Sequence, residues 1–188
     1  MIYERVIRPE IARKINRMLD KIPQGIRQIV EFQYGVKTYI CTRNFRGSSF
    51  TGKDYDIESH LDDPDLLTFA HFSSPERAIF MYDFSVEEVI RNQILAYDPF
   101  LHEYGHALDF ALGEISCHEL YEYCHQRGLD WYGNLNVYEC FAEAFATYFL
   151  KPPENYKPRH WFEHLPTELK RQNPALFTFL RSLEERNA

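Results

Sequence analysis

Several features that define other classes of protein are missing from this sequence of 188 residues. No run of about 18 apolar residues occurs, so we expect no helix that spans a membrane. The first residues, Met1-Ile2-Tyr3, lack the basic start and apolar run of a secretory signal. We therefore expect a cytoplasmic location, and a secreted or injected one only if a signal was removed or another delivery route exists.

Cysteine and basic residues are also scarce. Four cysteines are too few for a small disulfide scaffold, and we expect them to be reduced thiols. The 21 Lys and Arg residues are outnumbered by 28 Asp and Glu residues, which gives a net charge of −7. A non-specific nucleic-acid binder carries a basic surface that neutralises phosphates, so nucleic acid is not an expected partner.

The rest of the composition is typical of a globular protein, with 45% hydrophobic, 16% aromatic and 26% charged residues. These values argue against a disordered or low-complexity chain. A chain of this length buries about 70% of its unfolded surface on folding, which is enough for a core without disulfides. We expect residues 1–188 to form a single domain.

The apolar patterns predict an α+β fold with a small mixed sheet. The N-terminal sub-region, 1–97, holds β-branched and aromatic runs, whereas helical spacing dominates 98–188. The expected strands are 26–34, 36–45 and 77–84, of which the last is the candidate edge strand. The expected helices are 9–22, one that begins at Ser85, 98–112, 116–126, 137–150 and one within 166–185. The long polar loop at 46–65 is a candidate substrate loop.

The motif His102-Glu103-Tyr104-Gly105-His106 lies within the helix expected to begin at residue 98. Histidines four residues apart project from the same side of a helix, so both imidazoles can bind one Zn²⁺. The composition predicts only about 0.03 occurrences of such a motif by chance. Alternatively, the two imidazoles are ordinary hydrogen-bonded groups on a half-buried helix.

A catalytic zinc needs a third protein ligand and one open position. Metzincins place Gly three residues and His six residues after the motif, but Asp109 and Leu112 occupy these positions, which excludes that class. Glu139 and Glu143 lie one turn apart on an apolar helix, where unpaired carboxylates are unfavourable. In the simplest assignment Glu139 binds one zinc ion per chain, and Glu143 accepts the second N–H of an imidazole, most simply that of His102. Alternatively, both glutamates form surface pairs with Lys or Arg.

Two further residues are candidates for the chemistry. In a motif of this kind, the carboxylate of Glu103 accepts a proton from the water that zinc activates and delivers it to the leaving amine. A tetrahedral oxyanion also needs a hydrogen-bond donor, and Tyr132, which precedes the second helix, is a candidate. The chain has 13 tyrosines, so a simple packing role for Tyr132 is the alternative.

The two motifs resemble those of the gluzincin zinc peptidases. The resemblance is to the catalytic domain of anthrax lethal factor and to the bacterial Pro-Pro endopeptidases, and it covers residues 101–109, 132–150 and 174–180. It implies zinc ligation by His102, His106 and Glu139, and a role for Glu143 behind the ligands. It also implies that Glu103 is catalytic and that Tyr132, seven residues before Glu139, assists the oxyanion.

The sequence therefore predicts a zinc-dependent endopeptidase that cleaves an extended peptide or protein segment. A catalytically inactive zinc-binding domain that recognises peptides is one alternative, and a toxin effector protease that acts on a host protein is another. The chain has no room for the delivery domains of lethal factor, and Cys140 replaces the aromatic residue usual after the ligand glutamate in the family. Neither the cleavage preference nor the oligomeric state follows from the sequence.

Overall fold

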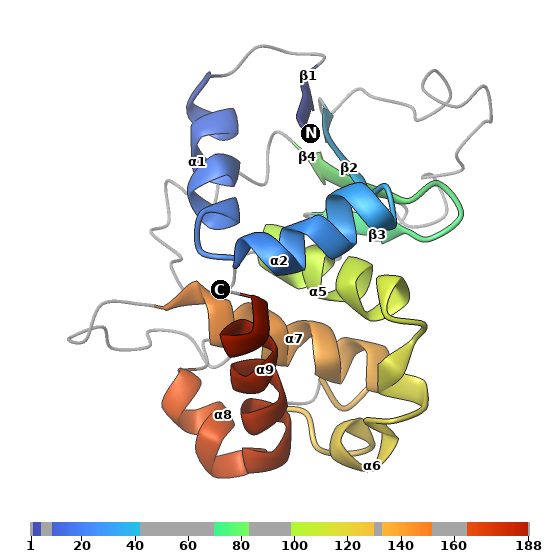
Figure 1. The fold of residues 1–188 in the computed structure, drawn as a ribbon, viewed down its shortest axis with the longest axis vertical. Coiled ribbons are helices and arrows are strands. Elements are labelled where there is room, and N and C mark those ends of the chain that lie inside the picture. Colours follow the sequence, from blue (N-terminus) through green and yellow to red (C-terminus); the bar gives the residue numbers. More distant parts are fainter. Residues whose placement is uncertain are drawn as a thin grey trace, which may run out of the picture.

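The computed structural model describes residues 2–4, 9–41, 70–82, 99–129, 133–151 and 165–187 (Figure 1). Its strands are β1 (Ile2–Glu4), β2 (Lys37–Cys41), β3 (Ala70–Ser73) and β4 (Ala78–Tyr82). Its helices are α1 (Pro9–Leu19), α2 (Gln24–Arg27), the π-helix η1 (Gln28–Gln33), α5 (Pro99–Ala111), the 3₁₀-helix η3 (Ile115–Cys117), α6 (Tyr121–Cys124), α7 (Val137–Leu150), α8 (Pro166–Gln172) and α9 (Pro174–Asn187). The predicted α+β class, with a mixed sheet followed by a helical half, is confirmed.

The sheet has the strand order β1-β2-β4-β3. β2 pairs in parallel with β1 and β4, whereas β3 pairs with β4 in antiparallel. The prediction that the 77–84 strand lies at the edge is wrong, because β4 lies between β2 and β3. The edge beside it is β3, which the turn at 74–77 folds back onto β4 and which packs against α5 (Figure 1).

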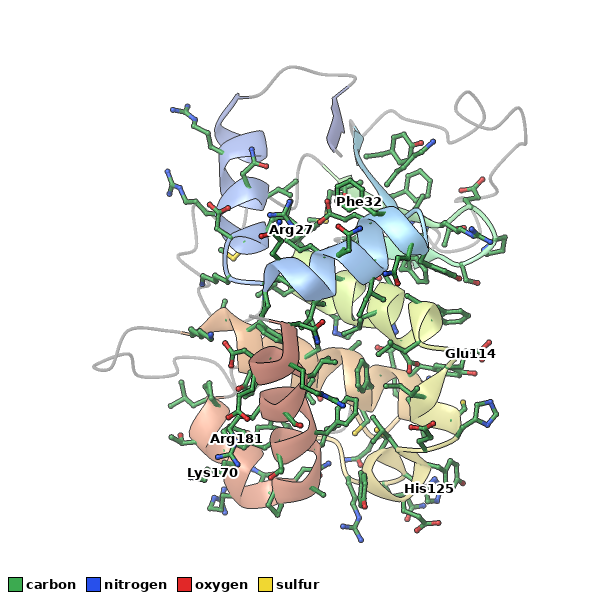
Figure 2. The ribbon with its side chains drawn as sticks, viewed as in Figure 1. Arg27, Phe32, Glu114, His125, Lys170 and Arg181 are labelled. Carbon is green, nitrogen blue, oxygen red and sulfur yellow. The ribbon has the colours of Figure 1, made fainter. Side chains whose placement is uncertain are left out.

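The strand predicted at 26–34 is also wrong, because this segment forms α2 and η1. Ile22, Ile26 and Val30 are buried at a spacing of four residues, which matches one face of a helix. Phe32 on the other side is 71% exposed (Figure 2). Gly35, with φ of 82°, ends the helical segment. Burial of one face against the core has outweighed the β propensity of the individual residues.

The two helices that carry the candidate site agree closely with their predictions. α5 begins at Pro99 and is followed by Gly113, whose φ is 83°. α7 begins after Asn136, whose side chain accepts a hydrogen bond from the backbone N–H of Glu139 at 3.0 Å. These two helices pack against each other in the middle of the molecule, between the sheet and α9 (Figure 1).

The other predicted helices differ in detail. The segment 116–126 is divided into η3 and α6, and the C-terminal segment is divided into α8 and α9 at Asn173. Asn173, which lies between α8 and α9, is buried, and its side-chain amide donates a hydrogen bond to the carbonyl of Tyr123. This hydrogen bond links the start of α9 to α6. The helix expected from Ser85 and the loop at 46–65 lie outside the described residues. Within the described ranges, no helix combines the length and apolar character needed to cross a membrane.

Candidate metal centre

His102 and His106 project from the same side of α5. Their Nε2 atoms lie 3.1 Å apart, and the ring planes are nearly perpendicular, at 82°. The His102 side chain is 1% exposed and that of His106 is 14% exposed. The helix therefore presents two imidazole nitrogens to one point, and His106 is the more accessible of the two.

Glu139 approaches this point from α7. Its Oε2 atom lies 3.0 Å from Nε2 of His102 and 3.5 Å from Nε2 of His106. Burial alone would raise the pKa of the Glu139 carboxyl, but the hydrogen bonds and charges of the two histidines outweigh burial and lower it. The same contacts, together with Glu103 and Asp109, raise the pKa of His106 against the opposing effect of burial. Both shifts favour the charged forms of Glu139 and His106, which attract each other.

The three groups could together hold a metal ion. Their candidate ligand atoms all lie within 4.8 Å of one another. Ligand atoms about 2.1 Å from a tetrahedral zinc are about 3.4 Å apart, and the three observed separations of 3.0, 3.1 and 3.5 Å are close to this value. Two imidazoles and one carboxylate are also a common ligand set of catalytic zinc. The residues fit such an ion with little movement.

Glu103 lies beside this cluster and faces the edge strand. The residue is 9% exposed, and its carboxylate accepts a hydrogen bond from the backbone N–H of Phe72 in β3. Burial raises the pKa of the Glu103 carboxyl, and this effect outweighs the opposing influence of His102 and His106. A raised pKa makes this carboxylate a better proton acceptor than an ordinary glutamate.

Glu143 is buried on α7, one turn after Glu139. The residue is 4% exposed, so it lies inside the protein and not on its surface. Its Oε2 atom lies against Gly133, where a Cβ would be only 2.0 Å away. Nδ1 of His102 is also buried. The hydrogen bond between His102 and Glu143 that the sequence suggests stays a prediction.

Tyr132 lies outside the described residues, so its catalytic role also stays a prediction. The residues on either side of the undescribed segment 130–132 are close together. The amide of Asn134 bonds with both backbone groups of Gly128, accepting from its N–H at 3.0 Å and donating to its carbonyl at 3.4 Å. A Cβ on Gly128 would lie 2.1 Å from the carbonyl carbon of Gly133, so the two backbones are in direct contact.

Sequence reasoning missed three groups that join α5 to neighbouring elements. The Phe72 N–H is a backbone group, and nothing in the sequence marks it. Asp109 is fully buried and accepts hydrogen bonds from Ser116 N at 2.9 Å and Ser116 Oγ at 2.6 Å, which holds η3 against α5. Tyr104 donates from its hydroxyl to Glu31 at 3.2 Å, which joins α5 to η1. A charged residue within an apolar helix was the available signal for Asp109.

The chain matches no model of a known protein family and no curated protein. The functional assignment therefore depends on the spacing of the two motifs and on the geometry of the metal centre.

Proposed function

We propose that this chain is a zinc-dependent endopeptidase of the gluzincin type. The observation that carries the proposal is the meeting of His102, His106 and Glu139 at one point, next to the buried carboxylate of Glu103. When bound there, zinc would lower the pKa of a coordinated water to about 7 and polarise the scissile carbonyl. A purely structural zinc site usually has four protein ligands, whereas three leave a position for water.

The protein groups would perform the proton transfers. Glu103 accepts a proton from the attacking water and delivers it to the leaving nitrogen. The Phe72 N–H holds the carboxylate beside the metal ligands. Burial of Glu103 raises the proton affinity of its carboxylate, which favours the first transfer, from water. Tyr132 remains the candidate donor to the oxyanion, as the resemblance implies.

The position of β3 supports an extended substrate. β3 is at the edge of the described sheet, and its Phe72 contacts the proposed catalytic carboxylate. A peptide that pairs with an edge strand is held straight by backbone hydrogen bonds, and its side chains alternate between the two faces. Such pairing beside Glu103 would place a peptide bond over the metal centre. We therefore propose β3, instead of β4, as the strand that aligns the substrate.

The substitution Glu103→Gln tests the catalytic role. The variant should keep one zinc ion per chain, because Glu103 is not among the three converging ligands. It should lose at least about 100-fold in cleavage rate, because the amide cannot accept the proton. The measurements are metal analysis by mass spectrometry and cleavage of a broad peptide library.

The library also separates the proposal from its alternatives. If zinc-loaded wild type cleaves no peptide yet binds some, the chain is an inactive peptide-recognition domain and the proposal is wrong. Cleavage that is equal in wild type and Glu103→Gln would contradict the role of Glu103. The cleavage profile would also show whether Pro-Pro bonds are preferred. If the preferred cleavage sequences occur only in host proteins, the profile would favour a toxin effector.

A further inference from the structure

Gly105 occupies a place where glycine is unfavourable. It lies in the interior of α5, and only proline is a poorer helix former. Its backbone does not require glycine, because Gly35 and Gly113 are the glycines with positive φ among the described residues. The residue is buried at the interface between α5 and α7. Space between the two helices, and not backbone conformation, is therefore the reason for glycine at this position.

The available space is too small for any side chain. A Cβ on Gly105 would lie 2.8 Å from the Cα of Ala142 and 3.1 Å from its carbonyl oxygen. It would also lie 3.1 Å from the Cβ of Phe145. All three are backbone or Cβ atoms, which no side-chain rotation can move away. Even alanine at position 105 would have to push α5 and α7 apart.

This contact lies directly beside the metal ligands. His102 and His106 flank Gly105 on α5, and Glu139 precedes Ala142 by three residues, or about one turn, on α7. Oε2 of Glu139 lies 3.0 and 3.5 Å from the two Nε2 atoms. Because the reach of a glutamate side chain is limited, the distance between the two helices affects whether this carboxylate can share an ion with the histidines.

We propose that Gly105 is a positioning residue for the metal centre. Because glycine has no side chain, α5 and α7 can lie at the spacing at which Glu139 completes the ligand set. This inference rests on the proposed zinc site. The histidines of the motif bind the metal and Glu103 transfers protons, whereas Gly105 sets the distance between the two helices.

The substitution Gly105→Ala tests the proposal when it is compared with Leu108→Ala. Leu108 is fully buried on the same helix, and its truncation leaves a cavity without forcing the helices apart. Zinc affinity is measured by competition with a chelator, and ligand geometry by the visible absorption of the Co²⁺-substituted protein. Urea unfolding of the metal-free chains measures stability. We expect Gly105→Ala to bind zinc about 10- to 100-fold more weakly, the range seen when a group that orients a ligand is lost.

The Co²⁺ spectrum should change in Gly105→Ala and stay as in wild type in Leu108→Ala, although Leu108→Ala is destabilised. Unchanged zinc affinity in Gly105→Ala would overturn the proposal, as would an equal loss of affinity in Leu108→Ala. If Gly105→Ala does not fold while Leu108→Ala does, glycine serves the fold as a whole and the positioning role is wrong. Wild type that binds no zinc would contradict the proposed function itself, which is a separate result.

Discussion

Two polar clusters that involve α5 each contain a carboxylate but differ in what that carboxylate faces. In the first, the buried carboxylate of Asp109 accepts two hydrogen bonds from Ser116. In the second, His102, His106 and Glu139 direct three ligand atoms toward one another. The donors of Ser116 satisfy Asp109 within the protein, whereas ligand atoms that face one another are the arrangement that a cation stabilises. A carboxylate near a histidine motif is therefore a metal ligand or a structural group according to what it faces.

The substitution with the largest expected effect is Glu139→Ala. It removes one of three converging ligands, so zinc should be lost from the purified protein after dialysis. Glu143→Ala is the matched control from the same helix, and it should weaken zinc binding by only about 10- to 100-fold. Metal analysis of both chains measures the difference. Equal zinc retention in wild type and Glu139→Ala would contradict the ligand assignment.

Asp109→Ala should show the opposite behaviour, with reduced stability and normal zinc content. The substitution leaves the buried N–H and hydroxyl of Ser116 without an acceptor, at a cost of about 2 to 3 kcal/mol. Urea unfolding of the metal-free chain gives the free energy of unfolding, and Ser116→Ala should cost less because it removes only the hydroxyl bond. Loss of zinc in Asp109→Ala with unchanged stability would show that the two clusters are not separate.

The substitution Gly133→Ala tests the close contact between Gly133 and the buried side chain of Glu143. Alanine would place its Cβ 2.0 Å from Oε2 of Glu143, so we expect a loss of about 1 to 3 kcal/mol. Glu143→Asp shortens the side chain by one methylene, and in that background Gly133→Ala should cost less. Urea unfolding of the four chains gives the coupling energy. If Gly133→Ala costs the same in both backgrounds, this contact does not explain the glycine.

The smallest expected effect on the free energy of unfolding is that of a substitution at Glu184 on α9. It accepts a hydrogen bond from Tyr148 at 2.6 Å and another from Lys151, and these contacts lower its pKa against the opposing effect of burial. Because the folded-state pKa is below the unfolded value of 4.5, the stabilisation is present above that value and is lost as the pH falls through the folded-state pKa. Glu184→Gln should cost less than about 1 kcal/mol at pH 7, and the cost should be smaller at pH 3, in urea unfolding. An equal cost at both pH values would show that ionisation is not involved.

The sequence predicted the helices of the candidate site well because strong local signals mark their ends. Pro99, Gly113 and Asn136 each act at the helix terminus where such a residue is expected. The motif spacing also indicated which side chains would share a helix face. The packing of α5 against α7 determines whether Glu139 lies next to His102 and His106. The resemblance to gluzincins implied this arrangement more strongly than the residue pattern did.

The N-terminal half was predicted less well because its structure depends on distant contacts. The segment 24–33 has β-branched and aromatic residues, yet the four-residue spacing of Ile26 and Val30 fits a helix whose face is buried. The strand β3 has only four residues and is defined by pairing with β4, which no local pattern reveals. The Phe72 N–H that contacts Glu103 is a consequence of this pairing.

X-ray absorption spectroscopy at the zinc edge of the purified wild-type protein tests the central claim most directly. We predict one zinc ion per chain with two imidazole ligands, nitrogen and oxygen atoms at about 2.0 to 2.2 Å, and no sulfur ligand. The absence of bound zinc, or a sulfur atom at about 2.3 Å, would contradict a centre formed by His102, His106 and Glu139.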